Sequence, residues 1–133
     1  MLAAAGHEAE IRLIVESAHT NPPDALARNI AAGGEVGHVE IYGERTDITE
    51  GDMQVQLYEV TTIPHVNPKT LAFVPSAGVL FQSDLFFGGP SADAQALYEA
   101  IISRDLAVQQ IVGGHGGVLP FTALEQAVSS TSP

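Results

Sequence analysis

Three residues of this sequence could act together as metal ligands: His65, Asp84 and His115. Imidazole nitrogens and carboxylate oxygens are the donors left to a zinc site in a chain that has no cysteine, as here. Each of the three lies at the end of a segment whose sequence predicts a strand. If the strand order brings these ends to one edge of a sheet, the three side chains converge on a zinc-type site.

Each residue also has a plainer interpretation. His115 lies between the glycine pairs 113–114 and 116–117, where bare backbone lets a ligand approach, but the same segment can be a turn with an exposed histidine. Asp84 follows the apolar run Val79–Phe81, and an acid there is bound, hydrated, or acts as a turn or capping residue. His65 lies in a loop, where a single histidine is usually just solvated.

The segments that must position these residues are predicted as strands. Leu71–Val74 and Val79–Phe81 flank a Pro/Gly turn, so we expect a β-hairpin that carries Asp84 at its end. Asp105–Val112 predicts a short connection into a buried strand that stops at the glycines before His115. Met53–Val60 alternates apolar and polar residues and predicts a strand that leads toward the loop of His65.

The first forty residues predict one strand and one helix. Ile11–Glu16 favours a strand, although Ile14 breaks the alternation and a helix also fits. A Pro-rich turn at residues 19–24 precedes a predicted helix, Ala25–Ala32, which Gly33 and Gly34 end.

The remaining elements follow the same reasoning. Val36–Tyr42 alternates as a half-buried strand does, and the polar residues 46–52 predict a connection into the next strand. Ala92–Ser103 has an apolar stripe at helical spacing, with Ser91 placed to cap it. A last helix is predicted at Phe121–Ser129, after Pro120.

Composition excludes one class of partner. Sixteen acidic side chains stand against five basic ones, the formal net charge is −11, and Lys and Arg form no cluster. A phosphate backbone would be repelled, so we expect no nucleic-acid partner. A hydrophobic content of 45% over 133 residues is enough for a globular core, and the length predicts a single domain over residues 1–133.

The ends and the apolar runs of the sequence bear on location. The opening six residues are apolar, carry no basic residue and lead directly into His7 and Glu8, which is not the pattern of a signal peptide. No segment approaches the roughly 18 consecutive apolar residues of a membrane span. We therefore expect a soluble protein with no membrane partner. The sequence does not specify its location, although the lack of a signal-peptide pattern favours the cytoplasm.

From Met53 onward, the order of the motifs resembles the C-terminal half of the metallo-β-lactamase superfamily. In that family a histidine in a Pro-Gly-His-like loop is followed by an apolar strand, a Pro-x-x-x-Val-Leu-Phe hairpin, a Gly-Asp or Ser-Asp step, a helix and a closing Gly-His-Gly. This sequence has, in the same order, Ile63-Pro64-His65, Leu71–Pro75, Gly78–Phe86 and Val112–Gly116. The resemblance covers at least Met53–Val128.

The resemblance implies an α/β fold, with a mixed β-sheet and helices packed on one face, as in one half of the family's αββα sandwich. It implies that His65 corresponds to the third histidine of the first metal site, Asp84 to the carboxylate that bridges two metals, and His115 to the terminal histidine of the second site. The family's leading motif, His-x-His-x-Asp-His, is absent, because no two histidines lie within three residues of each other. The implied cofactor is zinc in a partial site.

We therefore expect a metallo-β-lactamase-like half-domain, related to metal-dependent hydrolases, whose activity alone is weak or absent. A catalytic zinc typically keeps three protein ligands and one open position, so His65, Asp84 and His115 could hold one metal at most. Half of a sandwich also exposes the sheet face that the other half would cover, so we expect a homodimer or a higher oligomer.

Two alternatives stay open. One is a working metal-dependent hydrolase whose site is completed across an oligomer interface, or by His19 or His38. The other is a non-catalytic module that binds a small molecule or a protein, in which the segment around His115 is only a turn. The sequence does not specify a substrate.

Overall fold

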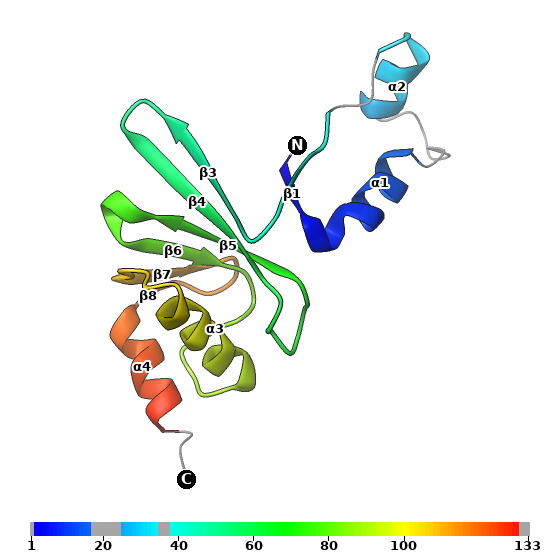
Figure 1. Cartoon of the computed structure of the whole chain (residues 1–133). Coiled ribbons are helices and arrows are strands. Elements are labelled where there is room, and N and C mark those ends of the chain that lie inside the picture. Colours follow the sequence, from blue (N-terminus) through cyan, green and yellow to red (C-terminus); the bar gives the residue numbers. More distant parts are fainter. Residues whose placement is uncertain (1, 17–24, 35–37, 131–133) are drawn as a thin grey trace. The chain divides into compact units, whose positions relative to one another are not determined.

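The structure, a computed structural model, describes residues 2–16, 25–34 and 38–130 (Figure 1). It divides into two compact units, residues 1–42 and residues 43–133, which we describe separately. The prediction of a single domain over residues 1–133 stays a prediction.

The second unit is built on a six-stranded mixed sheet with the order β3-β4-β5-β6-β7-β8. Neighbouring strands are antiparallel except β6 and β7, which run parallel and have helix α3 in the connection between them. The strands are β3 Arg45–Glu50, β4 Met53–Val60, β5 Lys69–Val74, β6 Val79–Gln82, β7 Gln110–Gly113 and β8 Val118–Pro120.

Helices α3 (Ala92–Ser103) and α4 (Phe121–Ser129) pack on one face of this sheet (Figure 1). Alternate strand residues point to the helices and form the core with them. The buried side chains include Tyr58, Leu71, Phe73, Leu80 and Ile111 from the sheet and Leu97, Ile101 and Leu124 from the helices. The predicted fold class, α/β with a mixed sheet and helices on one face, is confirmed. Among the described residues, no helix has the length and apolar character needed to cross a membrane.

The hairpin that leads to Asp84 forms as the sequence predicts. Pro75–Ala77 make a short 3-10 turn after β5, and Gly78 follows with φ at 61°, in the left-handed region that glycine adopts without steric cost. The chain then enters β6, whose last residue is Gln82. Asp84 therefore stands two residues beyond the end of this strand.

The predicted strand at Met53–Val60 and the two predicted helices of this unit are also confirmed. Ser91 caps α3 as expected, since its hydroxyl oxygen accepts a hydrogen bond from the backbone N–H of Ala94 at 3.0 Å.

One prediction for this unit is wrong. The polar segment 46–52 is not a connection but mostly strand: β3 pairs with β4 from Arg45 opposite Tyr58 to Glu50 opposite Met53. The turn is only Gly51 and Asp52. Because β3 is an edge strand that is exposed along nearly its whole length, no alternation of buried and exposed residues marks it in the sequence. Strand β8, only three residues long, was not predicted either.

The face of the sheet opposite the helices also carries apolar side chains, and we call it the outer sheet face. The strand pairing places Leu57, Ala72, Phe81, Val112 and Val118 in one row across it. Within this row Phe81 is 46% exposed and Val118 is 59% exposed. The same alternation adds Ile48, Met53, Val55, Val74 and Val79 to this face, together with the acids Glu50 and Glu59.

The first unit holds a small parallel sheet, in which β1 (Leu2–Ala4) pairs with β2 (Glu40–Tyr42). Between them lie a 3-10 turn (Ala5–His7), α1 (Glu8–Glu16) and α2 (Ala25–Ala31). The helix predicted at Ala25–Ala32 is confirmed, and Gly33 follows it with φ at 79°. Of the strand predicted at 36–42 only β2 forms, and residues 36–37 lie outside the described residues, as does the turn predicted at 19–24.

The strand predicted at Ile11–Glu16 is wrong, because this segment is the C-terminal part of helix α1. Ile11, Ile14 and Val15 recur at i, i+3 and i+4, a spacing that fits a helix as well as the partial alternation fits a strand. Arg12 and Glu8, one turn apart, form an ion pair at 2.8 Å that supports the helix.

Candidate metal centre

Strand pairing brings Asp84 and His115 together. β6 and β7 are parallel neighbours, and Gln82 at the end of β6 is opposite Gly113 at the end of β7. Each site residue lies two positions beyond its strand, so both emerge at the same edge of the sheet, between strands that are about 4.8 Å apart. A hydrogen bond from the backbone N–H of Gly114 to the carbonyl oxygen of Gln82, at 2.9 Å, extends the pairing into the loops.

The two side chains are in direct contact. His115 Nδ1 lies 2.5 Å from Asp84 Oδ1, and the Ser83 hydroxyl donates to Asp84 Oδ2 at 2.9 Å. The side chain of His115 is 79% exposed and that of Asp84 is 37% exposed. The pair is therefore open to a ligand from solvent.

The contact between Asp84 and His115 shifts the pKa of both side chains. The hydrogen bond from His115 lowers the pKa of the Asp84 carboxyl, and the hydrogen bond from Ser83 lowers it further. The hydrogen bond to Asp84 and the charge of that carboxylate raise the pKa of His115. The ion pair thus stabilises the carboxylate and the imidazolium together.

The directions of these two pKa shifts determine the pH range over which the ion pair stabilises the fold. His115 has its pKa raised above 6.5, so its contribution to stability is fully present below about pH 6.5 and is lost as the pH rises through the folded-state value. Asp84 has its pKa lowered below 3.8, so its contribution is present above about pH 3.8 and is lost as the pH falls through the folded-state value. Because both side chains are exposed, we expect salt to screen this contribution.

We expect the imidazole of His115 in the metal-free chain to titrate above 6.5, and Asp84→Asn to return its pKa toward that value. The chemical shifts of the imidazole protons, followed by NMR against pH, measure this. Asp93→Asn, which removes a carboxylate next to a different histidine, is the matched control and should leave the titration of His115 unchanged. A value at or below 6.5 in the unmodified chain would contradict the ion pair.

His65 has a different carboxylate partner. Its backbone N–H donates to Asp93 Oδ1 at 3.1 Å, and its Nδ1 lies 3.4 Å from Asp93 Oδ2. Asp93 belongs to the first turn of α3, so these contacts hold the loop of His65 at the start of that helix. In the structure Asp84 contacts His115, whereas His65 contacts Asp93. The predicted role of His65 as a metal ligand stays a prediction.

The pair offers two side chains of the kinds that bind zinc. Asp84 offers a carboxylate and His115 an imidazole, both of which zinc accepts, but a catalytic zinc takes three protein ligands. Within residues 2–16, 25–34 and 38–130, no group of three or more His, Cys, Asp or Glu side chains is arranged to hold a metal ion. His19, which the sequence left open as a further ligand, lies outside the described residues.

Glycine is required where the two loops approach each other. A Cβ atom on Gly114 would lie 2.9 Å from Ser83 Oγ, and one on Gly113 would lie 2.4 Å from the carbonyl oxygen of His115. Both distances are too short for a side chain without movement of the neighbours. Gly114 thus permits close packing of the His115 loop against the loop of Asp84, and Gly113 permits the His115 loop to fold back on itself.

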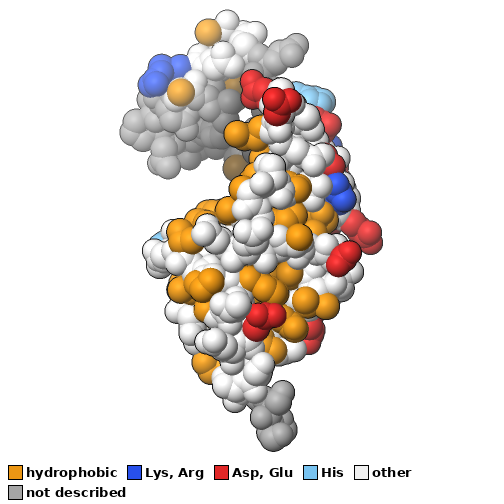
Figure 2. Space-filling model, turned by 90° about the vertical axis from the view of Figure 1, so that its left-hand side faces the viewer, with side chains coloured by type: hydrophobic (Ala, Val, Ile, Leu, Met, Phe, Trp, Pro, Cys, Tyr) orange, Lys and Arg blue, Asp and Glu red, His pale blue; other side chains and the backbone are white. Residues whose placement is uncertain are grey.

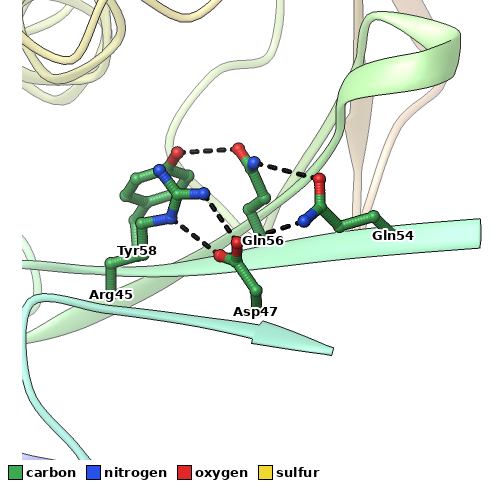
Figure 3. Close-up of polar contacts among 5 residues, drawn as sticks. All are labelled: Arg45, Asp47, Gln54, Gln56 and Tyr58. Atoms are coloured by element: carbon green, nitrogen blue, oxygen red, sulfur yellow. Dashed lines mark hydrogen bonds and ion pairs between the residues drawn. The ribbon is translucent and has the colours of Figure 1, made fainter. Parts of the chain in front are cut away.

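A second polar cluster, which sequence reasoning missed, lies on the ribbon of β3 and β4 (Figure 3). Arg45 donates to both carboxylate oxygens of Asp47, each at 2.7 Å, and its guanidinium lies 5.5 Å from the centre of the Tyr58 ring. These contacts raise the pKa of Arg45 and lower that of Asp47. Gln54 and Gln56 extend the chain of hydrogen bonds from Asp47 to the Tyr58 hydroxyl. The donors and acceptors satisfy one another, as expected of a cluster that fastens an edge strand.

Comparison with known proteins gives structural matches only. No family profile matches the sequence, and no curated protein matches it. A metallo-β-lactamase from Pontibacter korlensis is similar with a TM-score of 0.54 and 15% identity, over 77% of this chain and 52% of that chain. The rubredoxin oxygen:oxidoreductase of Desulfovibrio gigas is similar with a TM-score of 0.55 and 14% identity, over 77% of this chain and 34% of that chain.

A metallo-β-lactamase superfamily protein from Sulfolobus tokodaii also matches, with a TM-score of 0.49 and 16% identity, over 69% of this chain and 39% of that chain. The present chain thus spans between about a third and about a half of these three solved chains.

Proposed function

Because this chain has the fold of part of a metallo-β-lactamase, we propose that it is a partial relative of metal-dependent hydrolases, with an incomplete zinc site at Asp84 and His115. In this proposal the chain alone binds zinc weakly and hydrolyses esters, amides or thioesters slowly or not at all. A bound zinc would supply a Lewis acid and an activated water, and the described residues provide two of its ligands.

One observation carries the proposal: an imidazole and a carboxylate in contact at the carboxyl ends of two adjacent parallel strands, both open to solvent. In open α/β sheets the ends of adjacent strands are where ligands bind. Histidine and aspartate are also the donors that zinc selects when cysteine is absent. Zinc would have to displace the proton shared by the pair, so binding should weaken as the pH falls.

A second candidate is a hydrolase whose site is completed by another copy of the chain. It is favoured by the outer sheet face, where Phe81 and Val118 are both exposed in one apolar row. In the view of Figure 2, apolar side chains lie among polar ones on the exposed surface of the second unit. A homodimer that buries such a face could bring ligands from two chains to one metal.

We propose that the occupant of the outer sheet face is a second copy of this chain. The chain has a net charge of −11, so two copies repel each other over most of their surfaces. Of the charged strand residues, the strand pairing places only Glu50 and Glu59 on the outer face, so two copies could meet there with few opposed charges. A two-fold axis then sets each apolar row against its copy.

We expect the purified chain with added zinc to hydrolyse a generic ester, a lactam and a thioester no faster than free zinc does. The reason is that two protein ligands hold zinc too weakly to fix an attacking water. Turnover measured against protein concentration tests this, with His115→Ala as the control. Turnover that appears only as copies associate, and that His115→Ala abolishes, would favour the second candidate. Turnover by the single chain would contradict both proposals.

A further inference from the structure

Gln82 is a polar residue buried in the second unit. Its side chain is fully buried, and within residues 2–16, 25–34 and 38–130 no other polar or charged residue is buried to the same degree. It ends β6, so it directly precedes the loop that carries Asp84. A buried amide needs partners for its donor and its acceptor, and the nature of these partners indicates what the residue does.

Both ends of the amide bind the backbone just after Asp84. The side-chain oxygen of Gln82 accepts a hydrogen bond from the N–H of Leu85 at 2.7 Å, and its Nε2 donates to the carbonyl oxygen of Phe86 at 3.1 Å. Asp84 itself has φ at 62°, in the left-handed region, which is unfavourable for most residues with a side chain although aspartate adopts it more readily than most. The two bonds hold the chain in this reversed turn.

The backbone of the same residue binds the other loop of the site. The carbonyl oxygen of Gln82 accepts the N–H of Gly114, the residue before His115, at 2.9 Å. Gln82 is thus bonded to the segment after Asp84 and to the segment before His115. Few side chains could replace it, because glutamate cannot donate when ionised and methionine can neither donate nor accept an equivalent bond.

We infer that Gln82 is the positioning residue of the candidate site, which sets the carboxylate of Asp84 against the imidazole of His115. The inference concerns the same pair as the proposed zinc site, but it describes the metal-free chain. It can therefore be tested, and can fail, separately from the proposed function.

The test is NMR on the full-length, metal-free chain, comparing Gln82→Met with the unmodified protein. Methionine has a similar length and fits a buried position, but it leaves the Leu85 N–H and the Phe86 carbonyl without partners. We expect the nuclear Overhauser effect between the His115 ring and the Asp84 β-protons to disappear, and the Leu85 amide to exchange at least about tenfold faster. An unchanged contact between His115 and Asp84 would overturn the inference.

Leu71→Ala is the matched control, since Leu71 is fully buried in β5 and lies away from both loops in the sequence. It should lower the stability of the fold but keep the contact between His115 and Asp84, so loss of that contact in this variant would assign the effect to general loosening and overturn the inference. If Gln82→Met does not fold, hydrogen exchange of the Leu85 amide in the unmodified chain tests the inference instead. A Leu85 amide that exchanges only on global unfolding supports the inference, and one that exchanges as fast as a free peptide overturns it.

Discussion

Replacing His115 with alanine is expected to weaken zinc binding at least about 100-fold, because outer-shell changes alone cost about 10–100-fold and this change removes a ligand. The described part of the chain brings only Asp84 to the same place, at 2.5 Å from His115. A single exposed carboxylate binds zinc no better than many other acids of this surface do. Calorimetric titration of metal-free protein with zinc, at a pH above the pKa of His115, measures the change.

Two further variants separate the contributions of the other histidines. His7→Ala is the control, because His7 is not among the candidate ligands and pairs with Glu10 at 3.6 Å, so its loss should leave zinc binding unchanged. His65→Ala tests whether His65 is a metal ligand, as the sequence predicts, or only a partner of Asp93. A loss of zinc affinity as large as that of His115→Ala would make His65 the third ligand. Binding by His115→Ala that equals that of the unmodified chain would remove the candidate site.

Introducing a charge on the outer sheet face is the second large change. Phe81→Glu is expected to convert the proposed dimer to monomers, with a loss of affinity of at least about 30-fold, since replacing a hot-spot residue at an interface costs about 2 kcal/mol or more. Phe81 lies in the middle of the apolar row and is 46% exposed, so the folded single chain tolerates the charge. Sedimentation equilibrium over a range of protein concentrations measures the mass.

Ile102→Glu is the matched control for this variant. Ile102 is similarly apolar and is 54% exposed, but it lies on helix α3, which packs on the opposite face of the sheet. It adds the same charge and should leave the dimer intact. A mass of one chain for the unmodified protein at every concentration would contradict the dimer, and dissociation by both variants would point to net charge rather than to the outer sheet face.

The sequence predicted best the elements whose apolar pattern and turn residues agree. The hairpin before Asp84 has two apolar strands and a Pro/Gly turn, and α3 has both a stripe and a capping Ser91, so local preferences and packing lead to the same structure. Ile11–Glu16 was misassigned because six residues are too few to separate a period of 3.6 from a period of 2. β3 was missed because an edge strand with no buried face shows no pattern.

Only part of the candidate site could be predicted from the sequence. Asp84 and His115 could be named from the sequence because each follows an apolar strand, and the parallel pairing of β6 with β7 brings them together. The partner of His65 could not be predicted, because it depends on where the first turn of α3 lies relative to a loop 28 residues away in the chain. Gln82 left no signal, since one glutamine at a strand end has many possible roles until its hydrogen bonds are seen.

The central claim is that this chain holds an incomplete zinc site at Asp84 and His115. It is tested most directly by the number of zinc ions bound per chain, counted by native mass spectrometry after titration of the metal-free protein, with the oligomeric mass read from the same spectra. We predict at most one zinc ion per chain, bound weakly enough for dialysis to remove it. A monomer that retains two zinc ions through dialysis would contradict the claim.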